Sequence, residues 1–179
     1  NLISRVSEPD LLAGSSFLFP EATVGRLEYL NLINKTAEII PANPFSIPNE
    51  DGAADMIKGD QFFRTIQPNC WDEKIRIEEY ATHQTQVQVV CTIPVMFSYW
   101  ARPEDGYDIA RYLNDHIATV VQRHPNHFVG LGTLPLQAPD LAIQEAERCH
   151  KSLKLRGVQI GTHVNRWNLD DPRLYPVFE

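Results

Sequence analysis

The sequence predicts an α/β fold, a parallel sheet with helices packed outside it, and three apolar runs carry this prediction. The runs are VQVVCTIP at 87–94, FVGLGTLP at 128–135 and GVQIGTH at 157–163, and helical patterns separate them. Continuous apolar strands that alternate with helices are typical of a parallel sheet covered on both faces. In such sheets the chemistry lies at the carboxyl ends of the strands, so the residues after each run are the first candidates for function.

We expect parallel strands over about 87–93, 128–133 and 157–162, adjacent in chain order, because short right-handed crossovers favour that order. Helices are expected between them over about 103–124 and 138–153. The first begins with proline and two acidic residues, and its apolar residues recur every three or four positions. The second carries a stripe of small residues that suits close packing on a sheet: Ala142, Ala146 and Cys149.

An earlier helix is expected to run to about His83, with Asn69 or Asp72 as its N-cap. Before it, 62–66 alternates enough for a short strand. The segment 50–59 resembles a loop or a short helix, and the proline-rich stretch 41–48 is expected to lack regular structure. Residues 1–57 are therefore left as an unassigned N-terminal segment, and residues 58–179 are taken as the domain that the apolar runs define.

Composition excludes several classes of protein. The chain has 179 residues, a net charge of −7 and 43% hydrophobic residues, which indicates a globular domain without the basic stripe of a nucleic-acid binder. No apolar run reaches the ~18 residues of a membrane span. The three cysteines have no zinc-ribbon spacing and favour reduced thiols in the cytosol. The chain begins at Asn1 and stops where a helix begins after 170–172, so we expect a piece of a longer protein.

Few residues suggest chemistry by themselves. Arg64 is either a surface arginine or a bidentate clamp for a carboxylate. His163 follows the third strand, where lining a pocket and capping the strand are equally supported. Met96 lies in an apolar loop after the first strand, which forms a pocket wall or a packing cap. His116, His124 and His150 fall on helices and are expected in solvent, and no HxH, HxxH or HExxH metal motif is present.

Several long strings resemble the aminocarboxymuconate-semialdehyde decarboxylases, a family of the metal-dependent amidohydrolase superfamily. The strings are NCW at 69–71, TIPVMFSYWARPED at 92–105, RHPNHFVGLGTLPLQAPD at 123–140 and GVQIGTHVN at 157–165. Strings of this length are far more specific than a short motif. The resemblance covers about residues 58–179.

The resemblance implies a partial (β/α)₈ TIM barrel, roughly its first half, since a complete barrel takes about 250 residues. It also implies one catalytic divalent metal, zinc, and non-oxidative decarboxylation of 2-amino-3-carboxymuconate 6-semialdehyde in tryptophan (kynurenine) catabolism. Gln61-Phe-Phe-Arg64 aligns with the segment that bears the family's substrate-binding arginine, and Lys58 falls where the family has a lysine near the pocket. Phe63, Met96 and His163 would line that pocket.

The metal ligands and the catalytic residues are expected outside this chain. The family's His-x-His belongs on an upstream strand, and Thr36 and Glu38 stand at those positions if 33–41 is that strand. We therefore expect the 179-residue chain to be inactive alone. The partners implied are a small-molecule carboxylate substrate and a second copy of the chain, with no nucleic acid or membrane. Two alternatives remain: another decarboxylase or hydrolase of the superfamily, and an inactive half-barrel that serves as a binding module.

Overall fold

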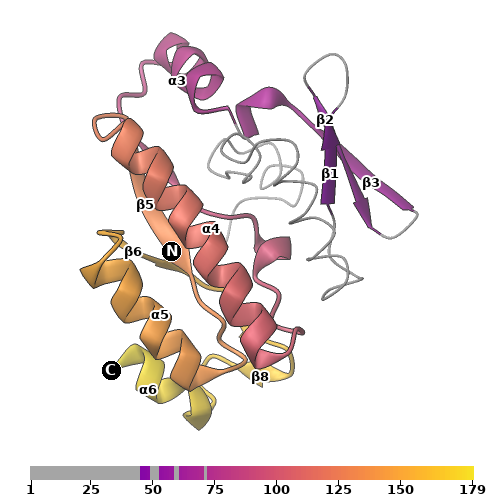
Figure 1. Cartoon of the computed structure of the whole chain (residues 1–179), viewed down its shortest axis with the longest axis vertical. Coiled ribbons are helices and arrows are strands. Elements are labelled where there is room, and N and C mark those ends of the chain that lie inside the picture. Colours follow the sequence, from indigo (N-terminus) through magenta and orange to yellow (C-terminus); the bar gives the residue numbers. More distant parts are fainter. Residues whose placement is uncertain (1–44, 49–52, 59–60, 71) are drawn as a thin grey trace.

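The computed structural model describes residues 45–48, 53–58, 61–70 and 72–179 (Figure 1). Within these residues, three antiparallel strands come first, and an alternation of parallel strands and helices follows. Most of the unassigned segment 1–57, including Thr36 and Glu38, lies outside the described residues.

The parallel sheet consists of β4 (Gln88–Val90), β5 (Phe128–Thr133) and β6 (Gly157–Gln159), in that order. Both pairings are parallel, and the helices α4 (Pro103–Arg123) and α5 (Pro139–Lys151) connect the strands. The helices lie side by side over β5 (Figure 1). The predicted strand type, order and direction are confirmed.

Two of the strands are shorter than expected, and the residues that follow explain why. After β4 the chain enters a 3₁₀ turn, η4 (Pro94–Met96), because Pro94 cannot donate to a strand ladder. After β6 it folds into a small antiparallel hairpin of β7 (His163–Val164) and β8 (Trp167–Asn168). A second 3₁₀ turn, η5 (Pro172–Leu174), and the short helix α6 (Tyr175–Phe178) follow.

Helix α3 (Glu73–Thr82) starts where the sequence predicts. The Asp72 carboxylate accepts the backbone N–H groups of Lys74 and Ile75 at 2.8 and 3.1 Å, so Asp72 is the N-cap. The helix ends at Thr82 with His83 as its C-cap, in agreement with the predicted end, and the 3₁₀ turn η3 (Pro68–Cys70) precedes the helix.

The strands β1 (Phe45–Pro48), β2 (Ala54–Lys58) and β3 (Gln61–Ile66) form an antiparallel sheet beside the barrel strands. The prediction that 41–48 lacks regular structure is wrong over 45–48, and the loop or short helix predicted at 50–59 is wrong over 54–58. Among the described residues, strand β1 pairs with β2 alone, and it has Pro48 at its end, a position where an edge strand tolerates proline.

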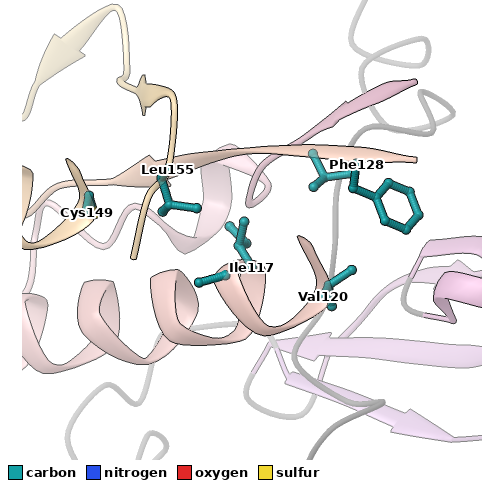
Figure 2. Packing of buried hydrophobic residues seen from close by; sticks show 7 residues of the cluster. Ile117, Val120, Phe128, Cys149 and Leu155 are labelled. Carbon is teal, nitrogen blue, oxygen red and sulfur yellow. The ribbon is translucent and has the colours of Figure 1, made fainter. Parts of the chain in front are cut away.

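The main core fills the space between the helices and the sheet (Figure 2). Val90, Ile117, Val120 and Phe128 are at most 1% exposed there. The expectation of solvated helical histidines is wrong for His116, which is buried on α4 because it lies on the packed side of that helix. His124 is only partly exposed, since its ring packs edge-on against Phe128.

A second cluster lies on the opposite face of the sheet. Ile66 at the end of β3 packs with Cys91 and Ile93, and the half-buried Met96 and Leu131 lie against them. The antiparallel sheet is therefore attached to the inner face of the parallel sheet through Ile66. Among the described residues, no helix combines the length and the apolar character that crossing a bilayer requires.

Candidate active site at the carboxyl ends of the strands

Three loops meet at one edge of the sheet because the strands that precede them are parallel. They follow β4 (91–102), β5 (134–138) and β6 (160–171). In α/β barrels this edge carries the reacting groups, whereas the opposite edge serves stability. Here the three loops are joined by specific contacts.

Tyr99 makes the central contacts of this edge. Its phenolic oxygen accepts the backbone N–H of Gly161 at 3.0 Å, and its backbone carbonyl accepts the Asn165 side-chain amide at 2.7 Å. The Phe97 ring stacks on the Tyr99 ring with centroids 5.5 Å apart. Burial raises the pKa of the Tyr99 phenol, so the side chain is neutral and serves as a structural tie.

Gln137 joins the second loop to the first. Its side-chain nitrogen donates to the backbone carbonyls of Ser98 and Ala101 at 3.3 and 3.4 Å. Beneath these bonds, an apolar cluster takes residues from all three loops: Phe97, Tyr99, Leu134, Leu136 and Val164. A Cβ on Gly106 would lie 2.1 Å from the Gln137 side-chain nitrogen, so the glycine leaves room for the joining residue.

His163 stands at the same end of the sheet as Pro94, as the barrel prediction requires. Its side chain is exposed, and its Nδ1 lies 3.2 Å from the hydroxyl of Thr162. The predicted role of His163 in lining a pocket remains a prediction.

Arg64 lies in β3, directly after a bulge. The pairing of Met56 with Arg64 and of Ile57 with Phe62 leaves Phe63 as the extra residue of β3. Bulges of this kind re-aim the side chains beside them and are common next to active sites. Arg64 shares a face of the strand with Ile66, two residues on, which packs on Cys91 and Ile93.

The charge of Arg64 also acts on Cys70, which packs on the inner face of the sheet. Burial raises the pKa of the Cys70 thiol, and the positive charges of Arg76 and Arg64 partly offset that effect. Cys70 packs against the Ile66–Cys91–Ile93 cluster. Arg64 is half-buried, and its positive charge acts on the Cys70 thiol beside that cluster.

The other predicted binding residues are less well placed. Lys58 pairs with Gln61 at the turn end of β2 and β3, the end away from Ile66. The side chains of Lys58 and Phe63 lie outside the described residues. Met96 is half-buried against the inner cluster, so packing already accounts for its position. The structure brings Arg64 and Met96 to the same side of the sheet, and the role of Lys58 remains a prediction.

The donor set does not fit a metal ion within the described ranges, where no three His, Cys, Asp or Glu side chains converge. A catalytic zinc usually takes three protein ligands. The described residues can therefore supply substrate contacts and the frame of the site, and any metal would need ligands from elsewhere.

A shallow groove of about 400 Å³ lies at the opposite edge of the sheet. The residues that line it include no acid, lysine or arginine, and they come from the end of α3 and from just before β4 and β5. This edge is the amino end of the strands, which serves stability in barrels, so the groove is not the candidate site.

Sequence reasoning did not find the ties that join the loops. Tyr99 stood out only as part of an apolar loop, and nothing local indicates that its partners are Gly161 and Asn165. Those contacts join positions 62 and 66 residues apart and depend on the tertiary fold.

Comparison with known proteins shows that this chain is similar to amidohydrolases. Residues 43–179 match the family model described as Amidohydrolase, so the match begins within the segment that the sequence left unassigned. A Dictyostelium discoideum protein named 2-amino-3-carboxymuconate-6-semialdehyde decarboxylase is 54% identical over 124 residues, which make up 69% of this chain and 34% of that protein. The family resemblance read from the sequence is confirmed.

Solved structures of decarboxylases have the same fold. The 5-carboxyvanillate decarboxylase of Sphingomonas paucimobilis is 32% identical with a TM-score of 0.58, over 61% of this chain and 32% of that one. A dihydroxybenzoic acid decarboxylase of Polaromonas, with bound manganese and 2-nitroresorcinol, is 26% identical with a TM-score of 0.57, over 61% and 35%. The chain spans about a third of the length of each of these proteins.

Proposed function

The chain belongs to the amidohydrolase family, and from this premise we propose that it is part of a metal-dependent carboxy-lyase that decarboxylates 2-amino-3-carboxymuconate 6-semialdehyde. The product would be 2-aminomuconate 6-semialdehyde, in the catabolism of tryptophan through kynurenine. The observation that carries this proposal is the 54% identity to the Dictyostelium decarboxylase over 124 residues, 69% of this chain.

Arg64 is the residue of this chain that we propose for substrate binding. A guanidinium presents a planar pair of donors that matches a carboxylate, and the proposed substrate carries more than one carboxylate. Support comes from the bulge that precedes Arg64 and from its face, shared with Ile66 on the inner side of the sheet. A hydrogen bond to a charged group typically contributes about 1.5–3 kcal/mol.

The joined loops would position the substrate without taking part in chemistry. Tyr99 and Gln137 hold the loop after β4 against the other two loops, which limits the freedom of Met96 and of His163 at that edge. Holding reactants in one geometry can lower a reaction barrier substantially. In this proposal Lys58, Phe63, Met96 and His163 remain secondary candidates for contacts with the substrate.

Zinc is the proposed cofactor, with ligands from outside the described residues. The Polaromonas structure contains manganese, which supports a divalent metal in this group of decarboxylases and leaves its identity to experiment. We also propose a cytosolic protein that pairs as a homodimer, as the family resemblance implies. The three cysteines of the sequence have no zinc-ribbon spacing, in keeping with a reducing compartment.

A second candidate substrate class is aromatic. Both solved structures named above are decarboxylases of hydroxylated benzoates, and each covers 61% of this chain. An aromatic carboxylate would use the same arginine contact, so Arg64 does not separate the two classes. A further alternative is an inactive half-barrel that acts as a binding module.

The test uses the complete gene product that carries these residues, purified and supplied with Zn²⁺ or Mn²⁺. It is assayed against the semialdehyde, 5-carboxyvanillate and 2,6-dihydroxybenzoate by loss of substrate absorbance. We expect the highest kcat/KM with the semialdehyde. Preference for either benzoate would replace the proposed substrate, and no turnover of any of the three would favour the inactive module.

A further inference from the structure

A buried polar side chain joins α4 to the carboxyl end of β5. Asn114 is fully buried, and its side-chain oxygen accepts the backbone N–H of Thr133 at 2.7 Å. Its side-chain nitrogen donates to the backbone carbonyl of the same residue at 2.9 Å. One amide therefore pairs with both backbone groups of Thr133, the last residue of β5.

Glu145 on α5 holds the Asn114 amide in that orientation. The Asn114 side-chain nitrogen also donates to the Glu145 carboxylate at 2.7 Å, and an acceptor-only carboxylate selects the nitrogen rather than the oxygen. Glu145 is fully buried, and Arg148 donates to both of its oxygens at 2.8 Å. This two-fold pairing raises the pKa of Arg148 and keeps a cation beside the buried carboxylate.

Gly132 makes the approach of Asn114 possible. A Cβ at this position would lie 2.8 Å from the Cys149 sulfur and 3.1 Å from the Asn114 side-chain oxygen. A side chain at position 132 would therefore point toward the helices. Because side chains alternate along a strand, that of Thr133, the next residue, points to the inner side of the sheet.

Thr133 stands directly opposite Gln159 of β6 in the parallel ladder, so the two side chains share the inner face. The Thr133 hydroxyl and the Gln159 side-chain oxygen are buried, and no described residue pairs with either atom. They lie at the carboxyl ends of their strands, the edge where a barrel meets its substrate. Buried polar atoms without partners are rare and point to a ligand or a water.

We propose that Asn114 is a positioning residue that holds Thr133, and through it the Thr133–Gln159 pair, against a polar group of the substrate. The inference rests on the proposed function. A hydroxyl can donate and a carboxamide oxygen can accept, so the pair suits an amino group beside a carboxylate. Asn114 acts only through Thr133.

The test is Asn114→Asp in the complete gene product, with the exposed Asn126→Asp as the matched control. The new carboxylate would face Glu145 without a donor between them. Two carboxylates this close raise the pKa of one of them, so a proton taken up at lower pH restores a donor. Arg148, Asp115 and the Cys149 thiol are the other ionisable groups around Glu145.

Two readouts decide the outcome: the exchange protection factor of the Thr133 amide, and kcat/KM for the semialdehyde. We expect both to fall about tenfold or more in Asn114→Asp near neutral pH and to recover together as the pH falls. Asn126→Asp should change neither. Full Thr133 protection in the variant, or lost protection with unchanged kcat/KM, would overturn the inference.

The two proposals fail in different ways. An unaltered protein that does not decarboxylate the semialdehyde overturns the proposed function and the catalytic part of this inference. An active protein in which Asn114→Asp leaves Thr133 protection and kcat/KM unchanged overturns the inference alone.

Discussion

The phenolic oxygen of Tyr99 lies 3.0 Å from the backbone nitrogen of Gly161 and accepts its N–H. Tyr99 follows β4 and Gly161 follows β6, and β5 lies between these two strands in the sheet. The bond therefore crosses the carboxyl end of β5. It joins the outer two of the three loops that we assign to the candidate site.

Removing this oxygen should loosen the loops without unfolding the domain. Tyr99→Phe leaves the Gly161 N–H without its acceptor, a loss worth about 1 kcal/mol and up to about 3 for a buried group. For a chain of this size about 1 kcal/mol lowers Tm by about 2–4 °C. Thermal unfolding followed by circular dichroism measures the change.

Tyr175→Phe is the matched control, because Tyr175 is 50% exposed. It should leave Tm unchanged. Equal Tm values for the Tyr99→Phe and Tyr175→Phe proteins would show that the bond to Gly161 does not contribute.

Gly132→Ala should destabilise the domain through overpacking. The new methyl group would lie 2.8 Å from the Cys149 sulfur and 3.1 Å from the Asn114 oxygen, within a packed layer. Overpacking of this kind costs about 1–3 kcal/mol. Urea unfolding gives the free energy directly.

Gly157→Ala is the comparison for that measurement. Of the described residues, its Cβ would meet only the flexible Leu131 side chain, at 3.3 Å, and Gly157 is exposed. We expect little loss, because alanine also lowers the entropy of the unfolded chain. If the Gly132→Ala protein is as stable as the Gly157→Ala protein, the contact between α4 and β5 adjusts to the added methyl group without a loss of stability.

The thiols should differ in reactivity according to burial. Burial raises the pKa of Cys91 to about 11, and burial together with the Glu145 charge raises that of Cys149 to about 12. Both stay protonated in the native protein near pH 8, so alkylation should reach the half-buried Cys70 first. Mass spectrometry of iodoacetamide-treated native protein identifies the order, and early labelling of Cys149 would contradict the packing of α5.

The same thiols give stability a pH dependence at the alkaline side. The native state keeps the two protons that the unfolded chain loses near a pKa of about 8.5. Their contribution is therefore fully present below that pH and is lost as the pH rises toward 11 and 12. Urea unfolding between about pH 8 and pH 11 should show stability falling, and the fall should shrink in Cys91→Ala compared with Cys70→Ala.

Much of the sheet could be predicted from the sequence because its signals are local. The apolar run 128–133 is bounded by turns. The apolar face of α4 can be recognised from its own sequence, without knowing what packs against it. Strands β1 and β2 were missed because proline and mixed composition mask strands that form through pairing with their neighbours in the sheet. The Asn114–Glu145 hydrogen bond was missed because it joins side chains on two different helices, 31 positions apart in the sequence.

The sequence alone leaves Arg64 as either a surface arginine or a carboxylate clamp, the family resemblance favours the clamp, and a direct test can decide. Arg64→Ala and Arg64→Lys should both lower kcat/KM by about 10–100-fold, since one charge-assisted contact contributes about 1.5–3 kcal/mol and lysine lacks the planar fork. Metal content should stay unchanged, because arginine is not a ligand.

Arg156→Ala is the control for charge removal. Arg156 is exposed and lies just before β6, at the opposite edge of the sheet. It should retain full activity. If Arg64→Ala keeps the wild-type kcat/KM, Arg64 is a surface arginine that does not bind the substrate.

The measurement that tests the central claim most directly is release of CO₂ from the semialdehyde by the complete gene product. The account predicts one CO₂ for each substrate consumed, a rate that is lost after the metal is removed by a chelator, and recovery when Zn²⁺ is returned. Arg64→Lys should slow this release, while Arg156→Ala should not. CO₂ release no faster than in the protein-free solution, or a rate that survives complete removal of the metal, would contradict the account.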